Sequence, residues 1–210
     1  MSVVEVLSQA VLTGDDEQMP DLISQALDEG LPARRILNEG LLAGMAEVGR
    51  RFRENEFFIP EVLVAAGAMK AGLQLLRPHL ARQGVQAAAT AVIGTVKGDL
   101  HDIGKNLVAM MLEGAGFEVV DLGVDVSAEQ FVEACRTHPV DLVALSALLT
   151  TTMPEMIGVV RLIRQELKPS PRVIIGGSPV TQQFTDEIGA DGYARDAATG
   201  AEVARQLCMG

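Results

Sequence analysis

Apolar residues in the first 83 positions recur with the spacing of helices. One series follows a single helical face. Its members are Ile36, Leu37, Leu41, Met45, Val48 and Phe52. A second series follows Pro60, which suits the first turn of a helix, and ends before Gly84. Because Asp15-Asp16-Glu17 and Pro32 mark two further helix starts, and Gly30 a stop, we expect four helices packed as a bundle.

From about residue 88 the pattern changes to short β-branched runs that alternate with helical segments. The runs predict strands at 90–96, 118–122, 141–146, 172–175 and 192–195. The segments between them predict helices at 103–112, 128–137, 153–167, 181–188 and 199–207. This alternation is typical of a parallel sheet covered on both faces. The sequence therefore predicts an α/β protein with a helical domain at 1–84 and a five-stranded, doubly wound, Rossmann-like domain of the flavodoxin type at 88–210.

Residues suited to ligand binding follow four of these five strands. They are Asp99, His101 and Gly104 after the first strand, Ser146 and Leu148 at the end of the third, Gly176-Gly177 after the fourth, and Asp196 and Ala197 after the fifth. The strand order 2-1-3-4-5 would make these four strands contiguous. Ligands of open α/β sheets bind at the carboxyl ends of the strands. One extended ligand could therefore contact all four loops.

An imidazole and a carboxylate lie two residues apart in the segment Gly98 to Asn106. Either Asp99 or Asp102 could hydrogen-bond one ring nitrogen of His101, which would leave the other nitrogen free to bind a metal. The flanking residues Lys97 and Lys105 are expected to be solvated.

Two other features leave alternatives open. Gly176-Gly177 would allow a ligand to lie against the backbone, but a tight turn would use the same residues. The hydroxyls of Thr150 to Thr152 could line a polar slot or cap the next helix.

Composition excludes several classes of protein. The chain of 210 residues carries a formal net charge of −11, which argues against a nucleic-acid partner. It contains no run of 18 apolar residues, and its N-terminus lacks the pattern of a secretory signal, so we expect a cytoplasmic protein that does not enter the membrane. The isolated Cys135 and Cys208 suggest neither a disulfide framework nor a zinc site.

Three linked elements resemble a known binding pattern. Asp99-x-His101-x-x-Gly104, Ser146-x-Leu148 and Gly176-Gly177, at these separations, are similar to the corrinoid-binding motif of cobalamin-dependent methyltransferases and mutases. The helical half resembles the cap of methionine synthase and of the corrinoid proteins that serve methanol, methylamine and methoxyarene methyl transfer. The matching residues are Gly44-Met45, Val48-Gly49, Phe52, Glu56-Phe57, Ile59-Pro60 and Val62. The resemblance therefore covers nearly the whole chain.

The resemblance implies that His101 is the lower axial ligand of cobalt and replaces the cofactor's own dimethylbenzimidazole, which is the base-off, His-on state. Asp99 is then expected to hydrogen-bond His101, and Ser146 to lie near the displaced nucleotide tail. Thr152 stands where methionine synthase has a serine that closes this relay, and its extra methyl group could tilt the hydroxyl. The further cofactor contacts that the resemblance implies are Gly98, Leu100, Asp102, Ile103, Gly104, Leu148, Thr150, Gly176, Gly177, Asp196, Ala197 and, in the cap, Phe52, Ile59 and Val62.

The resemblance also implies a role in one-carbon metabolism. The chain would carry a methyl group on cobalamin, in a cycle between Co(I) and methyl-Co(III), as one subunit of a multi-component system and not as a complete enzyme. The implied partners are a substrate-specific methyltransferase, an acceptor methyltransferase that uses tetrahydrofolate or a thiol, and an ATP-dependent reductive reactivase.

Three alternatives belong to other functional classes. A cobalamin-binding sensor or storage protein would lack methyl transfer. A phosphoacceptor receiver domain would need an aspartate where Ser146 stands, and a P-loop would need different glycine spacing and a hydroxyl where Asn106 stands.

Overall fold

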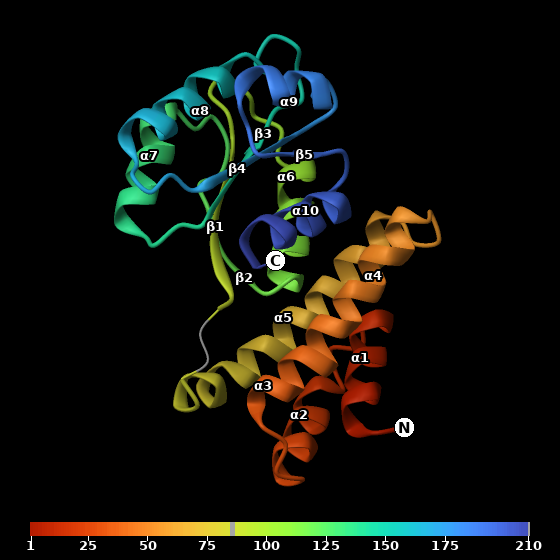
Figure 1. Ribbon diagram of the computed structural model, residues 1–210. Coiled ribbons are helices and arrows are strands. Elements are labelled where there is room, and N and C mark those ends of the chain that lie inside the picture. Colours follow the sequence, from red (N-terminus) through yellow and green to blue (C-terminus); the bar gives the residue numbers. More distant parts are fainter. Residues whose placement is uncertain (85–86, 210) are drawn as a thin grey trace. The chain divides into compact units, whose positions relative to one another are not determined.

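The computed structural model describes residues 1–84 and 87–209 (Figure 1). The chain forms two compact units, Met1–Ala87 and Ala88–Gly210. The first unit is helical, and the second contains the sheet.

The helical unit contains four helical stretches within residues 1–84. They are α1 (Val3–Thr13), α2 (Met19–Asp28), the unbroken series α3 (Ala33–Arg35), η1 (Ile36–Leu42) and α4 (Ala43–Arg53), and α5 (Ile59–Arg82). The segment η1 is a π-helix, which the periodicity of the sequence did not indicate. Pro32 is the N-cap of α3 and not its first helical residue, because its ψ of 138° is extended. The predicted helical bundle is confirmed.

Glycines allow close contact between α1 and the third helical stretch. A Cβ atom at Gly44 would lie 2.7 Å from both Ser8 O and Val11 Cβ, and one at Gly40 would lie 3.1 Å from Leu7 Cβ. Gly40 and Gly44 are one helical turn apart, so the missing side chains form a flat surface that receives α1.

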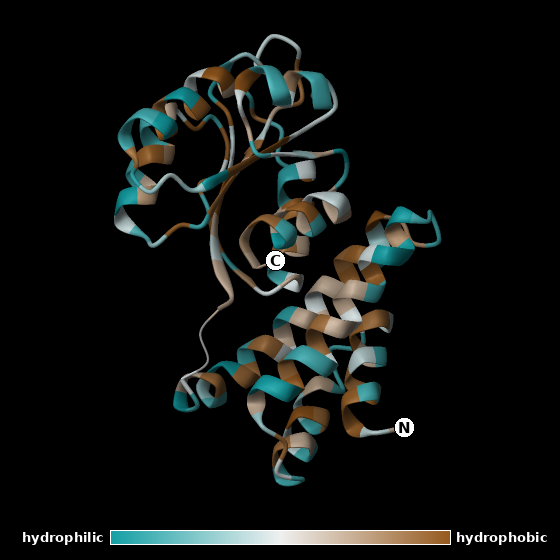
Figure 2. Ribbon diagram, viewed as in Figure 1, coloured by the Kyte–Doolittle hydropathy of each residue, from teal (hydrophilic) through white to brown (hydrophobic). Residues whose placement is uncertain are grey.

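Helix α5 is the one described helix that is long and apolar enough to cross a membrane by length and composition alone. It packs against α1, α2, η1 and α4 within the helical unit. Figure 2 shows brown and tan ribbon along much of the helical unit, with teal residues at intervals. One face of α5 is therefore buried within the unit, whereas Leu63, Val64 and Leu75 on this helix are exposed.

The second unit is built on five parallel strands. They are β1 (Ala89–Thr95), β2 (Phe117–Asp121), β3 (Leu142–Ser146), β4 (Arg172–Gly176) and β5 (Gly192–Ala194). Their order in the sheet is β2-β1-β3-β4-β5, which confirms the order inferred from the sequence. The register aligns Thr95 with Ser146 and Ser146 with Gly176, so three strands end at the same level.

Five helices cover the two faces of this sheet. They are α6 (Ile103–Gly114), α7 (Ala128–Thr137), α8 (Glu155–Glu166), α9 (Gln182–Ile188) and α10 (Ala197–Met209). Helix α6 packs against α10, whereas α8 packs against α7 and α9, and Figure 1 shows these two groups on opposite faces. Fully buried side chains between the sheet and α7 and α8, such as Phe131, Met156 and Ile163, form the core on one face. The fold is the predicted doubly wound, Rossmann-like one.

The glycine contact in the helical unit gives a prediction about stability. We expect Gly44→Ala to lower the free energy of unfolding by about 1–3 kcal/mol, because the new methyl group collides with the α1 backbone. Gly67→Ala in α5 is the matched control, since a Cβ atom there meets nothing within 4 Å and alanine favours the helix by about 0.5–1 kcal/mol. Denaturation followed by circular dichroism measures both, and equal stabilisation by the two substitutions would show that the close contact is absent.

Candidate functional site

The segment between β1 and α6 folds back on itself and brings an imidazole to a carboxylate. Gly98 has a φ of 79°, in the left-handed region, and the Asp99 amide donates to Val96 O at 3.1 Å. The buried Thr95 hydroxyl donates to the His101 carbonyl at 2.9 Å. The peptide groups of this segment are thereby fixed before α6 begins at Ile103.

His101 and Asp99 form a short hydrogen bond. His101 Nδ1 lies 2.7 Å from Asp99 Oδ1, and the His101 amide donates to the same oxygen at 3.1 Å. Asp99 is fully buried, whereas the His101 side chain is 51% exposed. An ionised carboxylate can only accept, so Nδ1 carries the proton and Nε2 is the ring nitrogen with a lone pair for a ligand.

The other oxygen of Asp99 is bound by the segment that follows β3. Asp99 Oδ2 accepts hydrogen bonds from the Leu148 amide at 2.8 Å and from Thr152 Oγ1 at 2.6 Å. Burial alone would raise the pKa of the Asp99 carboxyl, but the hydrogen bonds from Thr152, Leu148 and His101 outweigh burial and hold the pKa well below its usual range. Asp99 is therefore ionised at neutral pH.

The threonine at position 152 is accommodated without loss of this hydrogen bond. Its hydroxyl is within 2.6 Å of Asp99, and its Cγ2 methyl would lie 3.7 Å from a Cβ atom placed on Gly98, an ordinary van der Waals distance. The extra methyl group, which could have tilted the hydroxyl, therefore does not prevent this hydrogen bond. Thr152 also lies beneath the surface, with 8% of its area exposed.

Apolar side chains surround the exposed imidazole. Leu100 and Ile103 are 71% and 73% exposed, and Leu148 is 44% exposed. Large apolar side chains at such exposure are typical of a ligand or partner site when they cluster around a polar group. Gly98, Asp102, Gly104 and Thr150 are also exposed in these loops.

The two glycines at the end of β4 are required by backbone contacts within the protein. A Cβ atom on Gly177, whose φ is 131°, would lie 1.8 Å from Ala147 O, and one on Gly176 would lie 2.8 Å from Ala194 O. Ser146 is the last residue of β3, the strand between β1 and β4, and it is half-buried. The glycines thus bring the ends of β3, β4 and β5 close together at the edge where His101 lies.

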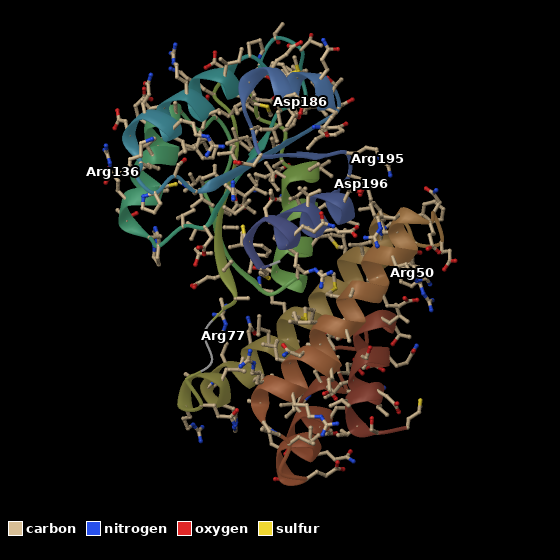
Figure 3. The ribbon with its side chains drawn as sticks, viewed as in Figure 1. Arg50, Arg77, Arg136, Asp186, Arg195 and Asp196 are labelled. Carbon is tan, nitrogen blue, oxygen red and sulfur yellow. The ribbon has the colours of Figure 1, made fainter. Side chains whose placement is uncertain are left out.

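The residues after β5 have local structural partners. Asp196 Oδ1 accepts from the Thr199 amide at 2.7 Å and so caps α10, beside Arg195 (Figure 3). Ala197 is 6% exposed. A cofactor would therefore meet the backbone here more readily than the Ala197 methyl group.

The expected contacts from the helical unit differ in exposure. Phe52 is half-buried in α4, and Ile59 is 43% exposed at the start of α5. Val62 is fully buried, so its side chain offers no accessible surface. Of the three, Val62 is the residue that the structure does not favour as a cofactor contact.

Sequence reasoning missed three contributors to the site. Lys105 was expected to be solvated, but this expectation is wrong: its side chain is 2% exposed and its ammonium pairs with Asp121 and with Asn106 Oδ1. Thr95 and Asp125 hold the segment 98–101 through hydrogen bonds. The available signals were weak, namely a hydroxyl at the end of an apolar strand and an aspartate two residues after a glycine.

The donor set fits a metal that brings most of its own ligands. Among the described residues there is no group of three or more His, Cys, Asp or Glu side chains that could hold a metal ion. A single oriented imidazole would bind a free ion poorly. A corrin ring would supply most of the ligands of such a metal, and His101 is the residue of this site that could supply one more.

Comparisons with known proteins agree with this geometry. A family model described as a B12 binding domain matches residues 89–202, and a second B12 binding domain model matches residues 3–77. A corrinoid protein from Desulfitobacterium hafniense is 39% identical, over 99% of this chain and 98% of that protein. Dimethylamine corrinoid protein 1 from Methanosarcina acetivorans is 41% identical, over 98% of this chain and 97% of that protein.

A solved structure shows the same likeness. The methanol:cobalamin methyltransferase complex from Methanosarcina barkeri contains a chain that superposes with a TM-score of 0.85 at 29% identity, covering 99% of this chain and 80% of that chain. Both units of the present chain therefore have counterparts among cobalamin proteins, and the bound group that the imidazole site fits is a corrinoid. The chain belongs to the corrinoid proteins of cobalamin-dependent methyltransferase systems.

Proposed function

We propose that this protein binds cobalamin in a state in which the cofactor's own base is displaced from cobalt. His101 Nε2 takes its place as the lower axial ligand. The observation that supports this proposal best is the Asp99–His101 pair, in which a buried, ionised carboxylate fixes the Nδ1–H tautomer of a half-exposed imidazole. Carboxylate–histidine pairs orient the ring and raise the basicity of the ligating nitrogen. When bound, the corrinoid supplies a cobalt that accepts a methyl group and gives it up again.

In this function the protein orients the His101 imidazole and allows it to leave cobalt and bind it again. Asp99 holds Nδ1, while the Leu148 amide and Thr152 hold Asp99, so the ring returns to one orientation after each release. Release of the imidazole makes its Nε2 available to a proton, so loss of the ligand and proton uptake are coupled. Leu100, Ile103 and Leu148 would cover the apolar edge of the corrin.

The displaced nucleotide tail would lie along the carboxyl ends of β3, β4 and β5. Ser146 and the glycines 176–177 are at this edge. These glycines let the backbone at the end of β4 pack closely against Ala147 and Ala194, so the three strand ends form one continuous edge along which the tail would lie. We assign the remaining contacts to Gly98, Asp102, Gly104, Thr150, Asp196 and Ala197.

We assign residues 88–210 to cofactor binding and residues 1–84 to a cap for the upper face of the corrin. Phe52 and Ile59 are accessible apolar residues of the helical unit and are the cap contacts that we favour. The cap would have to move aside when a methyl group is exchanged, because it would otherwise block access to cobalt.

We further propose that the chain is a carrier subunit that docks in turn with a substrate-specific methyltransferase, an acceptor methyltransferase and a reductive reactivase. The related structure from Methanosarcina barkeri is a methyltransferase complex, and the relatives include a dimethylamine corrinoid protein. The acidic composition and two unpaired, half-buried thiols are typical of a cytoplasmic protein.

Substitution of the imidazole tests the proposed ligand. After reconstitution with hydroxocobalamin, we expect His101→Gly to show a visible spectrum with water or the cofactor's own base on cobalt, and to bind cobalamin at least tenfold more weakly. His138→Ala is the matched control, because His138 is an exposed histidine at the end of α7. Identical spectra and affinities for wild type and His101→Gly would overturn the proposal.

Substitution of the carboxylate and its hydroxyl partner tests the relay. We expect Asp99→Asn to bind cobalamin but to shift the midpoint potential of the Co(II)/Co(I) couple to a more positive value, because a weaker imidazole donor stabilises the oxidised cobalt less. A tenfold weaker ligand corresponds to about 59 mV for a one-electron couple. Thr152→Val should shift the potential in the same direction by less, and Thr152→Ser should leave it unchanged. Spectroelectrochemistry measures all three, and an unchanged potential in Asp99→Asn would contradict the relay.

A further inference from the structure

The loop between β2 and α7 contains an aspartate in an unusual conformation. Asp125 has a φ of 56°, and it is one of two described residues other than glycine with a positive φ. This region costs free energy for most side chains, and aspartate and asparagine tolerate it better than other side chains do. An outlier of this kind often marks a functional constraint.

Asp125 makes two hydrogen bonds to the segment that carries the imidazole. Its Oδ1 accepts from the Gly98 amide at 2.7 Å, and its own amide donates to the Asp99 carbonyl at 3.0 Å. These two bonds hold the peptide groups on both sides of the Gly98–Asp99 link. Gly98 is the residue in that segment with the greatest conformational freedom, so this is the place where an added restraint has most effect.

The loop around Asp125 is itself held firmly by β1 and α6. The Thr95 amide donates to Gly123 O at 3.0 Å, and the Val126 amide donates to Thr95 O at 2.9 Å. Asp121, at the end of β2, pairs with the buried Lys105 ammonium of α6 and accepts from the Gly123 amide at 2.8 Å. Asp125 therefore holds the Gly98 amide and the Asp99 carbonyl from a fixed position.

The position requires two properties at once. Glycine would meet the conformational requirement but would provide no side-chain acceptor for the Gly98 amide. Alanine would provide no acceptor and would not tolerate the positive φ. Aspartate and asparagine meet both requirements, because each has a side-chain oxygen and tolerates the left-handed region.

We propose that Asp125 is a positioning residue that fixes the Gly98–Asp99 backbone and thereby the orientation in which the Asp99–His101 pair meets cobalt. The inference rests on the proposed function, because it concerns the strength with which His101 binds the metal. Asp125 acts through its oxygen acceptor and not through its charge. A displaced Asp99 would lose part of its bond to His101 Nδ1, and the imidazole would become a weaker and less well-directed ligand.

Three substitutions of Asp125 separate the effects of its side-chain acceptor oxygen, its tolerance of positive φ and its negative charge. Asp125→Asn keeps the acceptor and the tolerance of positive φ but removes the charge. Asp125→Gly keeps only the conformational freedom, and Asp125→Ala keeps neither property. The readout is the midpoint potential of the Co(II)/Co(I) couple in the reconstituted full chain, together with the unfolding midpoint of the protein without cofactor.

We expect Asp125→Asn to match the wild-type potential, and Asp125→Gly to show about tenfold weaker His101 ligation, which is a positive shift of about 59 mV. Asp125→Ala should show at least the same shift and a lower unfolding midpoint than Asp125→Gly. A wild-type potential in Asp125→Gly would overturn the proposal. So would a shift in Asp125→Asn equal to that of Asp125→Gly, because the charge would then carry the effect.

Asp141→Ala is the matched control for lost stability. Asp141 Oδ2 accepts one backbone hydrogen bond, from the Thr90 amide at 2.9 Å, near the amino ends of β1 and β3 and away from His101. We expect this variant to lower the unfolding midpoint and to leave the potential unchanged. An equal shift of potential in Asp141→Ala would show that general loosening of the sheet explains the result, and would overturn the proposal.

Two further measurements keep the outcomes distinct. The Gly98 amide of the wild-type protein should exchange its hydrogen slowly, and exchange at the rate of an unprotected amide would overturn the proposal even if Asp125→Gly failed to fold. His101→Gly is measured in parallel. If it has the wild-type potential, the proposed function fails, whereas a shift in His101→Gly with none in Asp125→Gly refutes only the role of Asp125.

Discussion

The buried carboxylate of Asp99 is the group around which the site is organised. Its two oxygens receive hydrogen bonds from the His101 ring, the His101 amide, the Leu148 amide and the Thr152 hydroxyl. A buried ionised carboxylate is unfavourable without such donors, so Asp99 constrains the segments after both β1 and β3. Because these donors come from two loops, the position of one imidazole depends on the register of two adjacent strands.

Much of the fold followed from periodicity and strand ends in the sequence. The strand order and all five helices of the second unit were predicted, and α7 was placed at its observed bounds, 128–137. Besides the π-helix, the differences were at element ends: α8 was expected from residue 153 and begins at Glu155, α10 was expected from residue 199 and begins at Ala197, and β1 was expected at 90–96 and lies at Ala89–Thr95. Capping by local side chains, such as Asp196, decides such ends and is weakly expressed in hydrophobic patterns.

The parts of the site that sequence reasoning missed depend on contacts between distant residues. Lys105 is buried because Asp121, sixteen positions away, provides its counter-charge, and neither residue signals this partner in the sequence. Asp125 contacts Gly98 across 27 positions, and its positive φ is a property of the folded loop. The glycines at 176–177 were noticed, but the carbonyl oxygens that require them belong to Ala147, just after β3, and to Ala194 of β5.

The proposed axial nitrogen belongs to the protein and not to the cofactor, and isotope labelling distinguishes these two sources. Uniformly ¹⁵N-labelled protein is reconstituted with unlabelled cobalamin, reduced to the Co(II) state and examined by electron paramagnetic resonance. The account predicts a doublet splitting from an axial ¹⁵N nucleus, and loss of that doublet in labelled His101→Gly. A triplet from axial ¹⁴N in the labelled wild-type protein would show that the cofactor keeps its own base, and would contradict the account.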